Sequence, residues 1–256
     1  MKIAFVNKST LVTDAQAAGI AQACINQINY HTAPAWGQTG VDGGFFAEKD
    51  VPAGYDKIVF FDNADQAGAL GYHTEDPDGS VYGKIFAHDT MSHGAQVMGG
   101  PGSVCSVASH EALELWQDRN VNKWAVGPDG VLYAWEVGDP VENDSYELYR
   151  TYAGSKVTVS NFALPAWFDD TPAPGSRFDY MGRLTAPFTM TPGGYVVYAT
   201  VGTPQQKFGA LSQAFILKAG AMNLVAHFSE GYPEWKKAKK LVGAARSARR
   251  FLKQVL

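Results

Sequence analysis

Residues 103–118 read SVCSVASHEALELWQD, and this stretch predicts a helix. Its apolar side chains are available to pack against a sheet: Val104, Val107, Ala108, Leu113 and Leu115. Because residues i and i+4 of a helix lie on one face, His110 and Glu114 can reach a single ion, while Glu111 sits beside them at a different angle. The stretch therefore predicts a helix that packs on a sheet and carries a metal site.

The spacing of His110, Glu111 and Glu114 is similar to the H-E-x-x-H helix of zincin peptidases, with glutamate in place of the second histidine. In the zincin mechanism the metal lowers the pKa of a bound water and the intervening glutamate takes its proton, which makes Glu111 the candidate base. Carboxylate ligands favour harder ions, so calcium, manganese or an empty site are alternatives to zinc. The other interpretation of the motif is a solvated helix face.

A third ligand has to come from outside this helix. Asp118 lies about 12 Å beyond His110 at about 1.5 Å per residue, too far to share the ion unless the helix breaks first. Glu136 follows Glu114 at about the separation found in zincins whose third ligand is a distant glutamate, and Asp139 is the competing candidate. Both carboxylates have the alternative role of capping turns around Pro140.

Three other histidines are interpreted differently. His73 and His88 lie on candidate strands and His93 lies in a loop, where local hydrogen bonds are their favoured role. A second metal site formed by His88, Asp89 and His93 is the alternative.

The residues before this helix predict a mixed sheet. Strands are expected at residues 2–6, 57–61, 70–73 and 81–88, and a helix capped by Asp14 is expected to run to about Ile28. A short extended segment should follow and end at residues 35–37. Alternation of strand and helix predicts parallel pairing, and the short turn at residues 76–79 predicts an antiparallel hairpin. The fold class is therefore α+β, a mixed β-sheet packed with helices, which is the layout of the upper half of a zincin. The side chains expected inside it are Ile3, Phe5, Ile58, Phe60, Ile85 and Phe86.

The second half predicts a loop-rich region that contains strands. Residues 127–130 form a turn signal, residues 131–137 and 195–201 are strand candidates, and residues 157–198 are rich in proline, glycine and aromatics. We divide the chain into a body of residues 1–230 and a tail of residues 231–256. Within the body, residues 1–120 form the upper region and residues 121–230 the lower region.

The tail differs in charge from the body. After Glu234 the chain has eight basic residues and no acidic ones, whereas the other residues hold 13 Lys and Arg against 25 Asp and Glu. Apolar residues recur at spacings of three and four from Trp235 to Val255, which predicts a basic amphipathic helix. A neighbouring subunit is the favoured partner of this helix. Nucleic acid, an anionic membrane and the acidic body of the same chain are the alternatives.

Bulk composition limits the class of protein. Of 256 residues 46% are apolar and 18% are charged, which is typical of a globular chain with a real core. The two cysteines, Cys24 and Cys105, are expected to be buried free thiols. We expect no signal peptide and no transmembrane segment, since no apolar run approaches the roughly 18 to 20 residues of a membrane span.

Several stretches together resemble a family of phage and prophage proteins with a zincin-like core. In order along the chain they are residues 35–37 (AWG), 69–73 (ALGYH), 109–114 (SHEALE), 136–142 (EVGDPVE), 159–162 (VSNF), 165–168 (PAWF), 186–188 (APF) and 192–195 (PGGY). The family often has Asp-Pro after the metal helix, whereas Arg119 follows Asp118 here. It often has Cys before the second Asp-Pro, whereas Gly138 stands here.

This resemblance implies a metallopeptidase-like fold in a phage setting. The expected function is a structural component of the virion, on the capsid or tail, in which a metal contributes stability. The alternative is an active metal-dependent peptidase or other hydrolase that acts on protein or on cell-envelope material. The implied location is the virion or the host cytoplasm, and the implied partners are other virion subunits.

Overall fold

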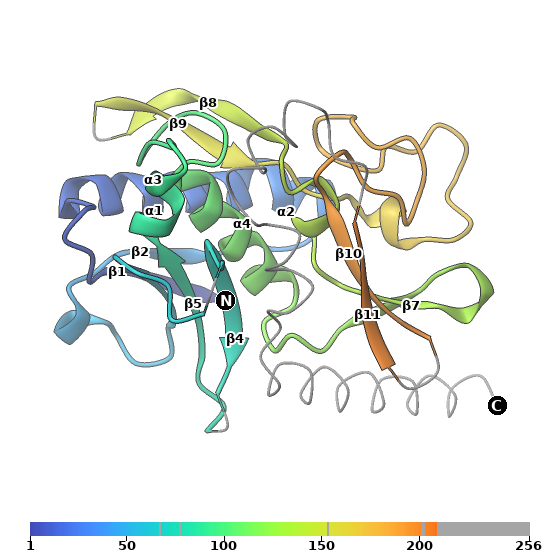
Figure 1. Cartoon of the computed structure of the whole chain (residues 1–256), viewed down its shortest axis with the longest axis horizontal. Helices are drawn as coiled ribbons and strands as arrows, with labels where there is room; N and C mark the ends of the chain where they lie inside the picture. The colour runs from blue at the N-terminus through green and yellow to red at the C-terminus, as the bar shows by residue number, and fades with distance from the viewer. Residues whose placement is uncertain (67, 77, 153, 201–202, 209–256) are drawn as a thin grey trace.

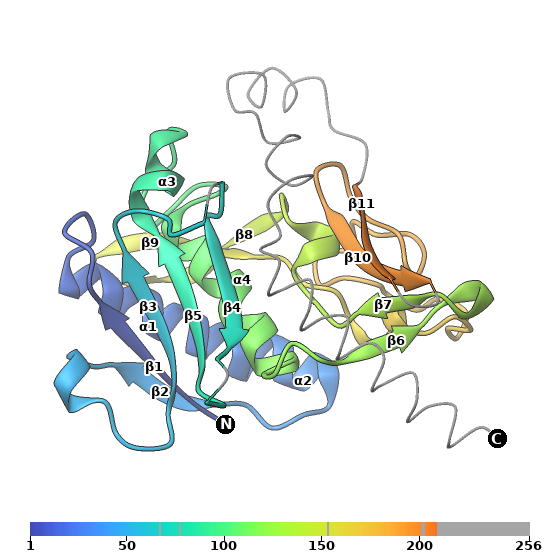
Figure 2. The same ribbon diagram turned by 60° about the horizontal axis from the view of Figure 1, so that its bottom comes forward.

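The computed structural model describes residues 1–66, 68–76, 78–152, 154–200 and 203–208. Its largest sheet has five strands in the order β2-β1-β3-β5-β4 (Figures 1 and 2). Four of them pair in parallel, and β4 at the edge pairs antiparallel with β5. The strands are β1 (Lys2–Asn7), β2 (Asp42–Phe45), β3 (Asp56–Phe61), β4 (Gly71–Glu75) and β5 (Val81–Phe86). The predicted α+β class with a mixed sheet is confirmed.

The first helix, α1, spans Asp14–Gln27, and its N-cap residue lies one position earlier than predicted. Thr13 is the N-cap, because its side chain accepts from the Gln16 amide at 3.2 Å while the Gln16 side chain accepts from the Thr13 amide at 2.9 Å. Asp14 is therefore the first helical residue, and the prediction that it caps the helix is wrong.

The prediction of an extended segment that ends at residues 35–37 is also wrong, because the chain stays helical there. A π-helical turn, η1 (Ile28–Thr32), leads into α2 (Ala33–Trp36), which ends at Gly37 with φ +61°. Pro34 lies inside this continuous helical run, directly after the π-helical turn, and its missing N–H removes one helical hydrogen bond there.

The second long helix, α4 (Val104–Gln117), is enclosed on two sides. It packs on strands β3, β4 and β5 and, on its other side, on the hairpin of β8 (Ser145–Tyr152) and β9 (Ser155–Ser160), as Figure 1 shows. Every residue of α4 except Val107 is buried. The predicted helix is confirmed, and Ser103 caps it by accepting from the Ser106 amide at 3.1 Å. A helix buried all round must satisfy each of its polar side chains inside the protein.

The predicted inner face of the sheet is confirmed. Each of its six expected side chains is at most 1% exposed: Ile3, Phe5, Ile58, Phe60, Ile85 and Phe86. Helices α1 and α4 cover this face. Both cysteines are free and buried in the same core, and burial raises the pKa of the Cys105 thiol to about 12.

The second half forms a four-stranded antiparallel sheet in the order β11-β10-β7-β6, which lies to one side of the five-stranded sheet (Figure 2). Its strands are β6 (Trp124–Val126), β7 (Leu132–Ala134), β10 (Tyr195–Thr200) and β11 (Thr203–Phe208). The strands expected at 131–137 and 195–201 are present, the first in shorter form, while β6 was not predicted. The remaining short helices are α3 (Ala87–Ser92), η2 (Glu48–Asp50), η3 (Pro128–Gly130), η4 (Asp139–Val141) and η5 (Pro165–Phe168).

The tail predicted to form a basic helix, residues 231–256, lies outside the described residues. Among the helices that the structure describes, none has the length and the apolar character needed to cross a membrane.

Candidate metal centre

A cluster of titratable side chains surrounds the C-terminal half of α4, and we call it the acid–histidine cluster. Seven of its eight members are at most 7% exposed, and the side chain of the eighth, Glu142, is 32% exposed. Its members are His73, His110, Glu111, Glu114, Asp118, Glu136, Asp139 and Glu142. Burying charges in this way is costly unless partners of opposite charge lie within reach.

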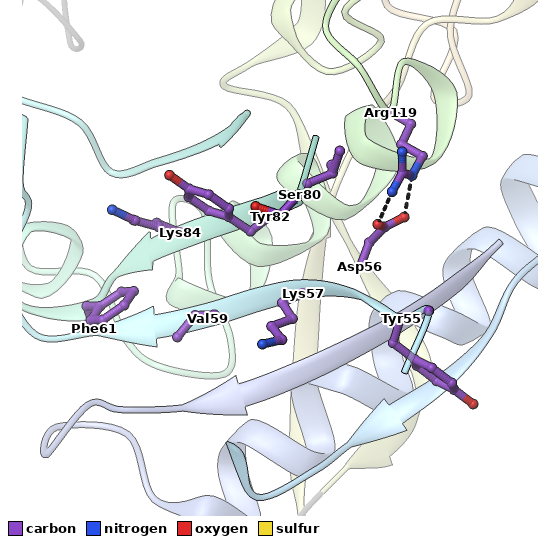
Figure 3. Close-up of a pocket in the computed structure, with 11 residues that line it drawn as sticks. Tyr55, Asp56, Lys57, Val59, Phe61, Ser80, Tyr82, Lys84 and Arg119 are labelled. Atoms are coloured by element: carbon purple, nitrogen blue, oxygen red, sulfur yellow. Dashed lines mark hydrogen bonds and ion pairs between the residues drawn. The ribbon is translucent and has the colours of Figure 1, made fainter. Parts of the chain in front are cut away.

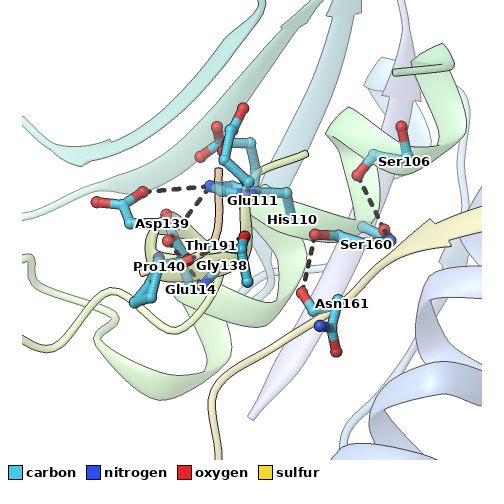
Figure 4. Close-up of polar contacts among 12 residues, drawn as sticks. Ser106, His110, Glu111, Glu114, Gly138, Asp139, Pro140, Ser160, Asn161 and Thr191 are labelled. Carbon is cyan, nitrogen blue, oxygen red and sulfur yellow. Dashed lines mark hydrogen bonds and ion pairs between the residues drawn. The ribbon is translucent and has the colours of Figure 1, made fainter. Parts of the chain in front are cut away.

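The first ligand group consists of His110, Glu114 and Asp139. The Nε2 atom of His110 lies 3.3 Å from Oε1 of Glu114 and 3.5 Å from Oδ1 of Asp139 (Figure 4). Two ligands of a tetrahedral zinc ion, each bound at about 2.0 to 2.1 Å, lie about 3.3 to 3.4 Å apart. These separations fit an ion shared by the three side chains, and they also fit weak hydrogen bonds from a protonated His110.

The loop before η4 positions this group through a close backbone approach. The amide of Gly138 donates to Oε1 of Glu114 at 3.2 Å, and the backbone of Gly138 lies against the ring of His110. A Cβ atom at this position would lie 2.4 Å from Nδ1 of His110, a distance that no side chain tolerates. The carbonyl of Pro140 accepts from the Thr191 amide at 2.9 Å, which holds the loop from its other side.

Glu142 contacts the far side of the same histidine. One of its carboxylate oxygens lies 3.1 Å from Nδ1 of His110. A carboxylate on the outer nitrogen is the usual partner of a metal-binding histidine, because it fixes the tautomer that leaves the inner nitrogen free for the ion. The sequence placed Glu142 in an acidic stretch without a role. Its position three residues after Asp139, on one short turn, was the available signal.

His73 reaches the cluster from the edge strand β4. Its Nδ1 atom lies 3.5 Å from Glu111 and 3.6 Å from Glu114, and its Nε2 atom lies 3.8 Å from Glu136. His73, Glu114 and Glu136 form the second group of possible ligands in the described residues. Sequence reasoning favoured local hydrogen bonds for His73, because only the pairing of β4 with β5 shows that Gly71 and His73 both face α4.

The structure separates the two candidates for the third ligand. Asp139 lies with His110 on one side of Glu114, and Glu136 lies with His73 on the other. Glu111, the candidate base, contacts His73 and belongs to neither ligand group. Asp118 accepts from the amides of Asn122 and Lys123 at 3.1 and 2.9 Å, so its carboxylate closes the loop after α4, in line with the expectation that it does not share the ion.

Proximity of these groups shifts their pKa values. Burial lowers the pKa of His73, but the hydrogen bond with Glu111 and the charges of Glu136 and Glu114 outweigh it and raise the pKa to about 9. Burial likewise lowers the pKa of His110, and the neighbouring carboxylates outweigh it, so that its pKa lies well above the usual value. Burial raises the pKa of Glu114 to about 8 despite the charge of His110.

These shifts predict how pH acts on the metal-free protein. The folded pKa of His73 exceeds its usual 6.5, so the stability that its proton provides is complete below about pH 6.5 and is lost toward pH 9. Ionising Glu114, whose pKa is raised from 4.5 to about 8, destabilises the fold in the same direction. A zinc ion at the first ligand group would displace the protons of His110 and Glu114, so it would bind more tightly as pH rises. Thermal unfolding with EDTA should show Tm falling from pH 6.5 to 9, while the increase in Tm caused by zinc grows. An equal fall in Tm with zinc and with EDTA would contradict this.

Two other candidate sites lie apart from the cluster. His88 and His93 are exposed and neither belongs to a ligand group of the described residues, while Asp89 accepts from the Ala64 amide at 2.7 Å. A cavity of about 410 Å³ lies on the opposite face of the sheet, where Lys57, Tyr82 and an ion pair between Asp56 and Arg119 line it (Figure 3). It contains no member of the acid–histidine cluster.

Comparisons with models of known protein families, with curated proteins and with solved structures gave no match.

Proposed function

We propose that the chain is a structural component of a phage virion with a zincin-like core, and that it binds a divalent cation, zinc in the first place, through His110, Glu114 and Asp139. The observation that carries the metal site is the pair of separations of 3.3 and 3.5 Å around Nε2 of His110, which match the edges of a zinc tetrahedron. The phage setting rests on the resemblance of the sequence motifs.

The arrangement of the elements supports the zincin-like core in this proposal. The ligand helix α4 is the second long helix, it follows the antiparallel pair β4 and β5, and it packs on a mixed sheet. This is the layout that the sequence predicted, with β2 as an additional edge strand.

A structural role for the ion fits the burial of its ligands. His110, Glu114 and Asp139 are 7%, 4% and 3% exposed, whereas a catalytic zinc needs an open coordination position for water and substrate. A general base must also lie within hydrogen-bond reach of the bound water, and Glu111 instead contacts His73. A bound ion would neutralise some of the buried negative charge and tie the loop at Asp139 to α4.

Zinc binding of the full chain tests the proposal. Purified protein equilibrated with zinc should retain at least one ion per chain, and His110→Ala should lower the content by one. The matched control is His88→Ala, which removes an exposed histidine and should change nothing. Free zinc at 100 times its Kd stabilises a fold by about 2.7 kcal/mol, so chelation should lower Tm by roughly 5 to 10 °C.

Unchanged zinc content in His110→Ala would contradict the metal site. Zinc-dependent hydrolysis of a peptide substrate, abolished by Glu111→Gln while zinc is retained, would replace the structural role with the peptidase alternative. Absence of the chain from purified phage particles would contradict the virion role.

A further inference from the structure

We infer that the acid–histidine cluster holds a second divalent cation, bound by His73, Glu114 and Glu136, and that Glu114 bridges the two ions through its two carboxylate oxygens. This inference rests on the proposed function, since the first ion shares Glu114. One ligand atom from each of the three residues lies within 4.8 Å of the other two.

The two oxygens of Glu114 face different histidines. Oε1 lies 3.3 Å from Nε2 of His110, and Oε2 lies 3.6 Å from Nδ1 of His73. A carboxylate divided in this way can bind one ion with each oxygen, as in centres whose two metals lie about 3.5 to 4 Å apart. Glu114 therefore has the position of a bridging ligand.

The surroundings of His73 leave one ring nitrogen for an ion. Its Nε2 atom lies 3.3 Å from the carbonyl oxygen of Asp118, which can only accept a hydrogen bond. When a neutral His73 donates from Nε2 to this carbonyl, the lone pair of Nδ1 faces Glu111 and Glu114 at 3.5 and 3.6 Å, while Glu136 lies 3.8 Å from Nε2. Lone pairs that converge at this distance need a cation between them. That cation is either a proton on Nδ1 or a metal ion.

His110 and His73 thus have the same design. The outer nitrogen of each ring contacts an acceptor, the Glu142 carboxylate in one case and the Asp118 carbonyl in the other. The inner nitrogen of each faces an oxygen of Glu114. Holding the outer nitrogen with a carboxylate or a backbone carbonyl is the usual support for a metal-binding histidine.

The carboxylates of the cluster outnumber its two histidines. Its six carboxylates are Glu111, Glu114, Asp118, Glu136, Asp139 and Glu142. The ion pairs that Lys8, Lys84, Arg119 and Lys156 form among the described residues are with other carboxylates. Divalent ions at both groups would place a positive charge beside each histidine. With a single ion at His110, only a proton on His73 would balance the carboxylates around that ring.

The number of zinc ions per full-length chain tests this inference. With zinc as the only added metal, the wild-type protein should bind two ions, His73→Ala one and His110→Ala one, while Glu114→Gln should weaken both sites. The control His88→Ala should keep two. Glu136→Gln, which preserves side-chain volume, provides a second variant of the His73 site should His73→Ala fail to fold, as judged by circular dichroism.

Manganese provides a readout that does not depend on counting. The electron paramagnetic resonance spectrum of the manganese-loaded wild-type protein should show two interacting ions, and that of His73→Ala or Glu136→Gln a single isolated ion. One ion in the wild type that persists in His73→Ala and disappears in His110→Ala would overturn the second site and leave the proposed function intact. One ion lost only in His73→Ala would overturn both, as would the absence of metal from every variant.

Discussion

Gly138→Ala is expected to weaken zinc binding by about 10- to 100-fold, the effect typical of displacing a group that orients a metal ligand. The added Cβ would lie 2.4 Å from Nδ1 and 2.6 Å from Cε1 of His110, so either the ring or the loop has to move. Such overpacking also lowers the free energy of unfolding by about 1 to 3 kcal/mol. Zinc titration and urea denaturation measure the two effects. The backbone φ of Gly138, −87°, suits alanine, so the cause would be steric contact alone.

Gly44→Ala is the matched control, because a Cβ there would meet its nearest neighbouring atom, on the Phe46 ring, at an ordinary 3.9 Å. It should leave zinc affinity unchanged. Normal zinc affinity in Gly138→Ala would contradict the packing of this loop on the ring of His110.

Phe60→Ala should lower the free energy of unfolding by about 3 to 5 kcal/mol. The Phe60 side chain is fully buried and stacks on Phe5, with ring centroids 6.5 Å apart, so its removal leaves a cavity in the inner face of the sheet. Denaturation by guanidinium chloride, followed by circular dichroism, measures the change.

The neighbouring residue gives the control. Phe61 lies on the same strand, is half-buried and lines the cavity on the opposite face, so Phe61→Ala should cause a clearly smaller loss. Equal losses in the two variants would contradict the assigned facing of β3.

Local patterns predicted the long elements and failed where tertiary pairing decides. The apolar run at residues 57–61 and the helical spacing of residues 103–118 are properties of neighbouring residues, and both elements are confirmed. The strand β6 has three residues and exists through its pairing with β7, so little local signal marks it. An extended segment was predicted to end at residues 35–37, but the chain there is helical, because η1 continues directly into α2.

In the candidate site, too, local patterns predicted some contacts and tertiary pairing decided the others. The relation of His110 to Glu114 follows from helix geometry alone, and the structure brings these two side chains together. Which carboxylate lies beside His110 depends on the path of the chain after β7, and the sequence left Asp139 as the competitor of Glu136. His73 is separated from Glu114 by 3.6 Å in space, yet only the antiparallel edge pairing of β4 brings it there.

The enclosure of α4 between the five-stranded sheet and the β8–β9 hairpin has a kinetic consequence. The amide hydrogens of such a helix exchange with solvent only when both covering layers separate, so their exchange reports the opening of the whole body. An ion bound to His110 and Glu114 would have two routes out, through that opening or through movement of the η4 turn, where the Glu142 side chain is 32% exposed. The hydrogen-exchange rate of α4 would therefore set a lower limit on the rate at which the ion leaves.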